Sequence, residues 1–374
     1  MLRLRRVPID TGSENIAFIH RRCPEFQIDE LNAMAHRVEI HGGLQPLFAT
    51  AYACDDENIV APDEIGLSLQ AYHLINLPEG AELAVSPAPP PASIESIRRK
   101  INGGILSAKE YRAIIADMAA YRYSPTELAA FLVSNASFMS PQEVLSMTEA
   151  LVEHRKPVDW GINLVVDEHC IGGLPANRTS MIVAPIAIAY GLCMPSTMTR
   201  SVTSCSGAAD AMEVLANVEL SEEQTAQTVS DIGGCMVLDG GRLAMSATED
   251  MLLGLEKSLS ISTPQQIVAS ILAGKIAMGI THLLIDIPVG KTAKIRTMSE
   301  AQSLRKLFEY VGDMLSMKID VIVTDGSEWM KVGRNSDNDI DYQLSFSVGR
   351  NTSRTRRTSV VGLFSSDGTV SLGR

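Results

Sequence analysis

The spacing of apolar and polar positions divides the first part of the chain at a proline-rich stretch. Residues 15–20, 37–41 and 46–52 form short apolar or alternating runs, which are typical of strands. Residues 1–85 are therefore predicted to form a small β-rich N-terminal domain. Residues 86–93 read SPAPPPAS, and because consecutive prolines fix φ and lack amide donors, this stretch predicts a short, semi-rigid linker.

After the linker, apolar positions recur every three or four residues, which is the period of a helix. Three predicted helix starts carry a serine followed three residues later by a glutamate, the pattern of a capping box. These pairs are Ser107 with Glu110, Ser124 with Glu127, and Ser140 with Glu143. Residues 94–158 are predicted to form a helical lobe, which a later segment at about 255–280 is expected to join.

From residue 160 onward, short apolar runs alternate with segments of helical length. The apolar runs lie at 162–166, 236–238, 282–287 and 319–324, and helical segments are predicted at 178–189 and 208–216. This alternation predicts a mostly parallel sheet that binds ligands at the carboxyl ends of its strands. The predicted fold class is α/β with a helical lobe, and residues 159–334 are predicted to form the α/β lobe that binds phosphate or nucleotide. Residues 335–374, rich in serine, threonine and glycine, are predicted to form a divergent tail.

Charge and composition exclude several classes of protein. The chain has 374 residues and a net charge of −12, which argues against binding to nucleic acid. Its most apolar stretch, 181–194, contains Pro185 and Gly191 and is shorter than the roughly 20 residues that span a bilayer, so no membrane partner is expected. The six cysteines form no CxxC pair and have no histidine at zinc-ligand spacing. We therefore expect no metal site, and reduced thiols in a cytoplasmic protein.

Two loops, each placed ahead of a predicted helix, carry the candidate chemistry. The first, 167–178, contains Gly172 and Gly173, and the second, 199–207, contains five hydroxyl side chains and Arg200. Glycines let backbone amides approach an anion, and hydroxyl and guanidinium groups donate hydrogen bonds to phosphate or sugar oxygens. Either loop alone also fits an ordinary turn, but two loops on successive βα units favour an anion site.

An apolar helix predicted at 265–279 carries Ser270 and Lys275. A single lysine on such a helix is expected to extend its amine to solvent.

Three longer runs carry a resemblance to a known family. They read VDEHCIGGLPANRTSMIVAPIAIAYGLCMP, TRSVTSCSGAADAMEVLANVELSEEQ and VASILAGKIAMGITHLLIDIPVGKTAKIRT. Together they resemble the thymidine phosphorylase/AMP phosphorylase family, most closely its longer bacterial branch with an extra N-terminal domain. The similarity covers most of residues 1–334, after which we expect the family's C-terminal region to be missing.

The resemblance implies a pentosyltransferase that cleaves the N-glycosidic bond of a nucleoside or nucleoside monophosphate with inorganic phosphate. The products would be a free base and a pentose 1-phosphate. The family implies two lobes, a homodimer, and no cofactor besides phosphate as co-substrate. It also implies substrate- or phosphate-binding roles for several positions, with His169 beside the base. These positions are Gly173, Thr199, Arg200, Ser201, Val202, Thr203, Ser204, Ser270 and Lys294.

Several positions depart from the family pattern. Ser262 stands where the AMP-type members have the aspartate that donates a proton, and a neutral hydroxyl is a poor general acid. Ala208 replaces a phosphate-binding hydroxyl, and the family's lysine pair is Gly274-Lys275. Glu168 replaces a lysine of the thymidine phosphorylases, so that repulsion of phosphate replaces attraction.

These departures leave two hypotheses open. The first is an active phosphorylase whose candidate catalytic residues are Ser262, at the position of the family's aspartate, and, if the proton comes from elsewhere, Glu249, Asp250 or His169. The second is a catalytically impaired relative that binds nucleotide or phosphate without turnover.

Overall fold

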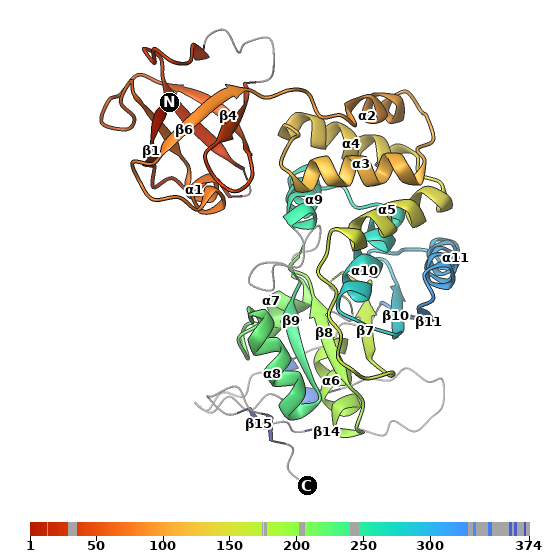
Figure 1. The fold of residues 1–374 in the computed structure, drawn as a ribbon. Helices are drawn as coiled ribbons and strands as arrows, with labels where there is room; N and C mark the ends of the chain where they lie inside the picture. Colours follow the sequence, from red (N-terminus) through yellow and green to blue (C-terminus); the bar gives the residue numbers. More distant parts are fainter. Residues whose placement is uncertain are drawn as a thin grey trace. The chain divides into compact units, whose positions relative to one another are not determined.

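The computed structural model describes residues 1–12, 14–28, 36–173, 175, 178–201, 206–239 and 247–327, together with short strands beyond residue 331. The chain forms two compact units (Figure 1). The first contains Met1–His154 and Ser246–Leu259, and the second contains Arg155–Met245 and Ser260–Arg374. The predicted tail, 335–374, lies almost entirely outside the described residues.

The first unit begins with a closed barrel whose strand order is β1-β5-β2-β4-β3-β6. The strands are β1 (Leu2–Arg6), β2 (Ile16–His20), β3 (Arg37–His41), β4 (Leu47–Cys54), β5 (Glu64–Leu67) and β6 (Glu82–Pro87), and helix α1 (Leu69–Ile75) follows β5. Side chains that alternate along the strands, such as Leu2 and Leu4 on β1, fill its core. The β-rich fold predicted for this segment is confirmed.

The predicted linker, 86–93, begins inside strand β6. Ser86 pairs with Glu39 and Pro87 with Val38 on β3. Pro87 is the last residue of β6, and because proline lacks an amide donor, it cannot donate a further hydrogen bond to the ladder. The stretch that leaves the barrel therefore starts after Pro87.

The rest of the first unit is helical. Its helices are α2 (Ile94–Ile101), α3 (Ala108–Ala119), α4 (Pro125–Ser137), α5 (Pro141–Glu153) and α9 (Ala247–Leu259). The three predicted capping boxes form at the starts of α3, α4 and α5. On α4, for example, the Ser124 amide donates to Glu127 Oε2 at 2.8 Å, and the Glu127 amide donates to Ser124 Oγ at 3.3 Å.

The segment at about 255–280, expected to join the helical lobe, is divided between the two units. Helix α9 packs on α3 and α4, whereas α10 (Pro264–Ala277) belongs to the second unit. Helix α10 buries residues on several faces, including Val268, Leu272 and Lys275, and it contacts α11 (Met298–Met314). A helix that is apolar all round requires burial on more than one side, which the α/β unit provides.

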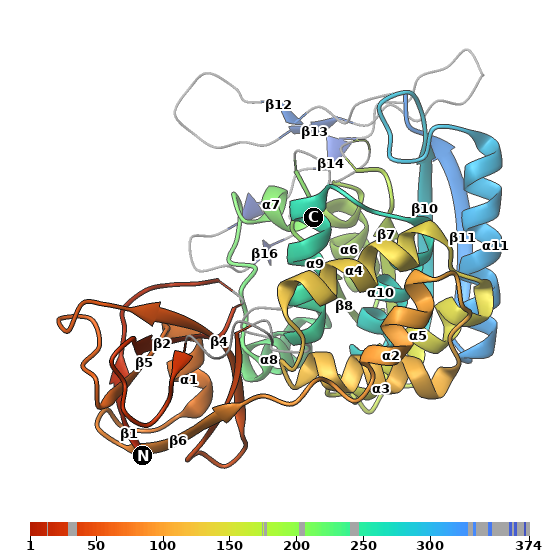
Figure 2. The same ribbon diagram turned by 90° about the horizontal axis from the view of Figure 1, so that it is seen from above.

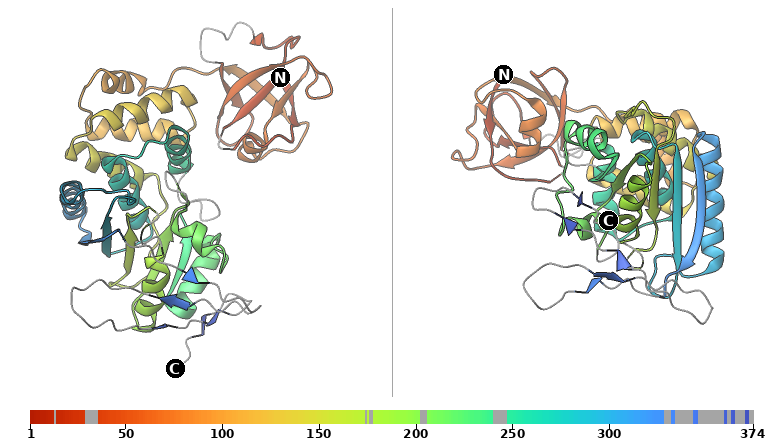
Figure 3. Two further views of the ribbon diagram at one scale, coloured as in Figure 1. Left: turned by 180° about the vertical axis from the view of Figure 1, so that it is seen from behind. Right: turned by 90° about the horizontal axis from the view of Figure 1, so that it is seen from below.

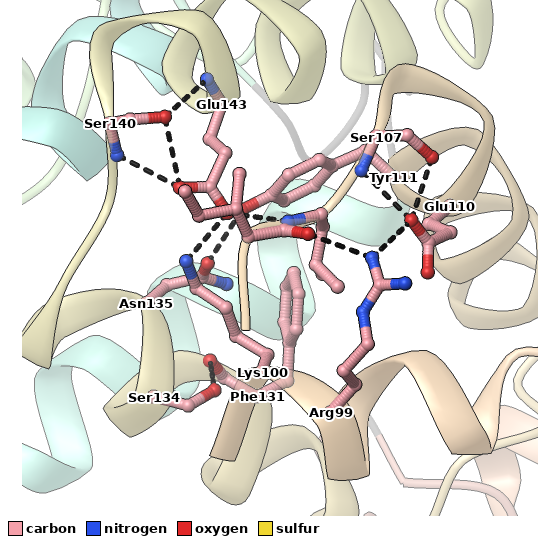
Figure 4. Close-up of polar contacts among 12 residues, drawn as sticks. Arg99, Lys100, Ser107, Glu110, Tyr111, Phe131, Ser134, Asn135, Ser140 and Glu143 are labelled. Carbon is pink, nitrogen blue, oxygen red and sulfur yellow. Dashed lines mark hydrogen bonds and ion pairs between the residues drawn. The ribbon is translucent and has the colours of Figure 1, made fainter. Parts of the chain in front are cut away.

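A buried polar cluster joins the helices of the first unit (Figure 4). Glu143 on α5 accepts hydrogen bonds at 2.6 Å from Lys100 on α2, at 2.9 Å from the Leu106 amide and at 3.4 Å from the Tyr111 hydroxyl. Its other oxygen accepts from the Ser140 amide at 2.9 Å and from the Ser140 hydroxyl at 3.0 Å. Burial alone would raise the pKa of Glu143, but these hydrogen bonds outweigh it and lower the pKa.

The second unit is built on parallel strands. They are β7 (Val166–Cys170), β8 (Met194–Met198), β9 (Gly234–Leu238), β10 (His282–Val289) and β11 (Lys318–Asp325). One sheet has the order β11-β10-β7 and another pairs β8 with β9, and a parallel bridge between Val165 and Cys193 connects them. Every described pairing among these strands is parallel, so the predicted parallel sheet is confirmed.

Helices cover both faces of this sheet. Asp167 on β7 bonds to α10, and its neighbour Glu168 bonds to α6 (Thr179–Ala189). Because successive side chains of a strand point to opposite faces, α10 and α6 lie on opposite sides. Helix α11 lies along β10 and β11, as Figure 2 and, from two further sides, Figure 3 show. Helices α7 (Ala208–Met212) and α8 (Glu222–Ile232) complete the unit.

One strand starts later than its apolar pattern predicted. The predicted run, 162–166, lies mostly ahead of β7, and Ile162 and Leu164 are exposed. The strand instead contains the polar sequence VDEHC, and all of it except Val166 was predicted to lie in a loop. The buried charges of this strand find partners on α10 and α6, which is what lets a charged segment occupy the centre of a sheet.

No helix in the described part of the chain is long and apolar enough to span a membrane.

Candidate functional site

The two loops predicted to bind an anion lie at one edge of the sheet. The first follows β7, and the second follows β8, the strand on the far side of the Val165–Cys193 bridge. Because all these strands are parallel, their carboxyl ends meet at the same edge. The structure therefore places the loops of Gly173 and Thr199 at the same edge of the sheet.

The first loop has no room for a side chain at Gly172 and has a backbone conformation that favours glycine at Gly173. A Cβ atom on Gly172 would lie 1.9 Å from the Pro175 carbonyl oxygen, and Gly173 has a φ of +66°, which favours glycine. The Lys294 amide donates to the Gly172 carbonyl oxygen at 3.3 Å. The loop that carries the exposed Lys294 therefore lies against the first loop.

The second loop is closed by Asp210 on α7. Its Oδ2 atom accepts from the Ser201 amide at 2.9 Å and from the Gly207 amide at 2.8 Å. A Cβ atom on Gly207 would lie 2.7 Å from the Thr199 carbonyl oxygen, so the ends of the loop approach closely. Val202, Thr203 and Ser204, the predicted phosphate-loop residues between these ends, lie outside the described residues.

Arg200 points its guanidinium group at carboxylates. It contacts Glu213 at 2.6 Å, Glu219 at 2.9 Å and Asp210 at 3.5 Å. The hydrogen bonds to Glu213 and Glu219 raise the pKa of Arg200 and keep it charged. Its predicted contact with the ligand stays a prediction, and binding would have to compete with these three acids.

Lys275 is buried, and the expectation that it extends to solvent is wrong. Its side chain is 2% exposed, and its ammonium group donates to Asp167 Oδ2 at 2.5 Å, to the Thr197 carbonyl oxygen at 2.8 Å and to Thr197 Oγ1 at 3.0 Å. A buried ammonium group requires such partners. No local signal in the sequence indicated this pair, because Asp167 lies 108 positions and Thr197 78 positions from Lys275 in the chain.

Glu168 is also buried, on the opposite face of β7. The residue is 2% exposed, and its Oε2 atom accepts from the Ser180 hydroxyl at 2.5 Å. Its Oε1 atom is buried with no hydrogen-bond partner among the described residues. Burial, with a smaller contribution from the charges of Asp167 and Asp286, raises the pKa of Glu168 to about 7.

The half-buried His169 is neutral at physiological pH. Burial and the positive charges of Lys275 and Lys294 lower its pKa to about 3. A neutral imidazole can hydrogen-bond a base, but it does not act as a cationic acid. Beside it, burial raises the pKa of the Cys170 thiol well above its usual value, and burial also raises the pKa of Asp286.

The remaining predicted site residues are more dispersed. Ser262 is half-buried two residues ahead of α10, and Ser270 is half-buried on that helix. Glu249 and Asp250 lie on α9 in the other unit, and their side chains are outside the described residues. The described side chains include no group of three His, Cys, Asp or Glu that could hold a metal ion.

Comparisons with known proteins agree with this architecture. The "Glycosyl transferase family, helical bundle domain" matches residues 94–155, and the "Glycosyl transferase family, a/b domain" matches residues 163–306. The chain is 45% identical over 327 residues to a "Putative thymidine phosphorylase" of Rhodopseudomonas palustris, covering 87% of this chain and 63% of the relative. A protein of the same name from Methylococcus capsulatus is 45% identical over 335 residues, covering 89% of this chain and 64% of the relative.

A solved structure shares the fold at low sequence identity. The crystal structure of anthranilate phosphoribosyltransferase from Thermus thermophilus has a TM-score of 0.50 and 17% identity, covering 66% of this chain and 69% of that one. The chain thus carries both domains of one family but spans less than two thirds of the length of its curated relatives. It belongs to the glycosyl transferase family defined by this helical bundle and a/b domain, within which its resemblance to the thymidine phosphorylases is confirmed.

Proposed function

We propose that the protein is a pentosyltransferase that cleaves a nucleoside or nucleoside monophosphate with inorganic phosphate. A phosphate oxygen forms a bond to C1 of the pentose, the C1–N bond breaks, and the base leaves with a proton. The observation that carries the proposal is that two candidate loops follow neighbouring parallel strands and lie at the same edge of the sheet. The names of the relatives, which are 43–46% identical, point to the same reaction class.

The residues of the second unit suit the binding steps. The loops at Gly172–Gly173 and Thr199–Ser201 offer backbone amides and hydroxyl groups to phosphate. Neutral His169 offers a hydrogen bond to the base, and the exposed amine of Lys294 adds positive charge near the first loop. Holding phosphate beside C1 supplies the proximity that the reaction needs as the sugar becomes positively charged.

Specific observations favour a second candidate, a relative that binds nucleotide or phosphate without turnover. The side chain at 262 is a hydroxyl, Arg200 is paired with three carboxylates, and Glu168 is a buried acid next to the first loop. Each of these weakens proton donation or anion binding relative to the family pattern.

One assay separates the two candidates. Purified protein is incubated with a panel of nucleosides and nucleoside monophosphates, with and without inorganic phosphate, and free base is followed by chromatography. Phosphate-dependent release of a base supports the phosphorylase. If no substrate releases base while a nucleoside or monophosphate raises the melting temperature, the binding protein is the better description.

We also propose that the protein acts as a homodimer in the cytoplasm. Size-exclusion chromatography with light scattering tests the first part, and a mass equal to that of one chain at micromolar concentration would contradict it.

A further inference from the structure

The carboxyl group of Glu168, close to the first loop, is hydrogen-bonded through only one of its two oxygens among the described residues. One oxygen accepts from Ser180 at 2.5 Å, and the other is buried with no partner among the described residues. Ser180 lies in the first turn of α6, the helix that the first loop enters. The carboxyl group therefore lies against the end of α6 that the Gly172–Gly173 loop leads into.

That end of α6 is where an anion would be attracted. The N-terminus of a helix carries a partial positive charge and unpaired amide groups, and an ionised Glu168 would satisfy much of that attraction from inside the protein. A phosphate ion placed there would then face a like charge in a poorly solvated environment. The two negative charges disfavour each other, and losing one of them removes the conflict.

We propose that Glu168 couples phosphate binding to proton uptake: the first loop takes an inorganic oxyanion only while the Glu168 carboxyl group is uncharged. The inference rests on the proposed function, since it concerns the phosphate of that reaction. It makes Glu168 a residue that determines when the co-substrate binds.

The charges around Glu168 come from several elements, and they do not cancel its own. Asp286 faces it from β10, and Asp167, His169 and Cys170 share its strand. Lys275 reaches the opposite face of β7 from α10, where Asp167 already pairs with it, and Arg178 stands at the N-cap of α6. Ser196 and Thr197 on β8 carry no charge.

Burial raises the pKa of Glu168 to about 7, and the two nearby acids add to this effect while Lys275 is already paired with Asp167. Protonation of Glu168 is therefore accessible at physiological pH.

The test measures oxyanion binding by calorimetry in the full-length protein between pH 6 and pH 8.5. Sulfate is the main probe because it does not titrate in this range, and inorganic phosphate is measured alongside. In the wild-type protein we expect the sulfate affinity to fall roughly 30-fold across the range, as one proton with a pKa near 7 requires. In Glu168→Gln the affinity should change by less than about twofold over the same range, because no proton is then taken up.

Two further variants sharpen the result. Glu309→Gln removes an exposed carboxylate on α11 and should keep the pH dependence of the wild type. Ser180→Ala removes a hydrogen bond that lowers the pKa of Glu168, so the midpoint of the sulfate curve should move to higher pH. This second variant tests the coupling even if Glu168→Gln fails to fold.

The outcomes distinguish the inference from the proposed function. If wild-type protein binds both oxyanions with the same affinity at every pH, or if Glu168→Gln keeps the wild-type pH dependence, the coupling is wrong but the phosphate site stands. If neither oxyanion binds to the wild type or to Glu168→Gln at any pH, the phosphate site of the proposed function fails, and the coupling fails with it.

Discussion

Each unit of this protein buries a lysine beside a carboxylate, yet the two clusters differ in how completely their charges are satisfied. In the helical unit, the side chains of Lys100 and Glu143 are 1% and 0% exposed, and both oxygens of Glu143 accept hydrogen bonds. In the α/β unit, Lys275 and Asp167 form an equally buried pair, but the neighbouring Glu168 keeps one oxygen without a described partner.

The two clusters differ in whether the charge of the buried acid can change near physiological pH. Hydrogen bonds lower the pKa of Glu143, so it stays ionised near physiological pH. Burial raises the pKa of Glu168 to about 7, so its charge can change near physiological pH. A fully bonded buried network stabilises one arrangement of helices, whereas an incompletely bonded buried acid is the kind of group that is often found at functional sites.

The largest expected effect comes from breaking the cluster of the helical unit. Lys100→Met leaves the carboxylate of Glu143 buried without its cation, which should lower the free energy of unfolding by about 3–5 kcal/mol. Urea denaturation followed by circular dichroism measures the change. A loss below about 1 kcal/mol would mean that water or a neighbouring group replaces the lysine, and that the cluster does not hold the helices together.

The matching change in the α/β unit is Lys275→Met. It leaves Asp167 buried with only the Thr197 amide, at 3.3 Å, as a described partner of Oδ2, and should cost about 3 kcal/mol of unfolding free energy. Hydrogen exchange should show the loss at amides of β7 and β8, with the helices α2 to α5 unchanged. Uniform loss of protection across both units would contradict the assignment of Lys275 to the second unit alone.

A third prediction concerns pH and stability. The pKa of Glu168 is raised in the folded protein from an ordinary value of 4.5 to about 7, so its contribution to stability is fully present below pH 4.5 and is lost as the pH rises through 7. Above that range, Glu168→Gln should be more stable than the wild type by up to about 3 kcal/mol. At pH 4.5 the two proteins should unfold at nearly the same urea concentration. A stability difference that does not vary with pH would show that folding does not raise the pKa of Glu168.

The sequence predicts contacts between residues that are close in the chain, but not the contacts of the buried lysine clusters, which join distant segments. The capping boxes at Ser107, Ser124 and Ser140 were predictable because each depends on residues three positions apart. The burial of Lys275 was not, because its partners Asp167 and Thr197 lie 108 and 78 positions away in the chain. A helix that is apolar on several faces gives no indication of which contacts its lysine will form, and the prediction of exposure rested only on the usual tendency of a single lysine to extend to solvent.

The candidate site was predictable in part, for a related reason. The glycines of the first loop are required by local backbone geometry, so their spacing already pointed to a tight turn. The state of Glu168 depends instead on the strand pairing that buries β7 and on the position of Ser180 on α6. The apolar pattern placed the strand too early, and with it assigned Glu168 to a loop.

A fourth prediction concerns Ser262, which lies two residues ahead of α10, and asks whether a carboxylic acid at that position improves proton donation. If the protein releases base, Ser262→Asp should raise kcat/KM about tenfold or more, because a carboxylic acid is a far better proton donor than a hydroxyl group. The chromatographic assay at several pH values measures it, and the gain should fall as the pH rises and the new acid ionises. An unchanged kcat/KM would show that the proton comes from another group, with Glu249 and Asp250 the next to test, since neutral His169 is no cationic acid.

The smallest expected effect comes from an exposed ion pair, which tests whether burial is what makes the loss of Lys100 costly. Arg112 and Glu153 form an ion pair on the helical unit at 2.7 Å, nearly the 2.6 Å of Lys100 and Glu143, but their side chains are 46% and 49% exposed. Glu153→Gln should therefore lower the free energy of unfolding by only about 0.5 kcal/mol, because water screens the pair and solvates whichever partner is left. The same urea titration measures it, and added salt should remove the effect here while leaving that of Lys100→Met. If the two substitutions cost the same, distance rather than desolvation would set the strength of these pairs, and the contrast between the buried clusters would need another cause.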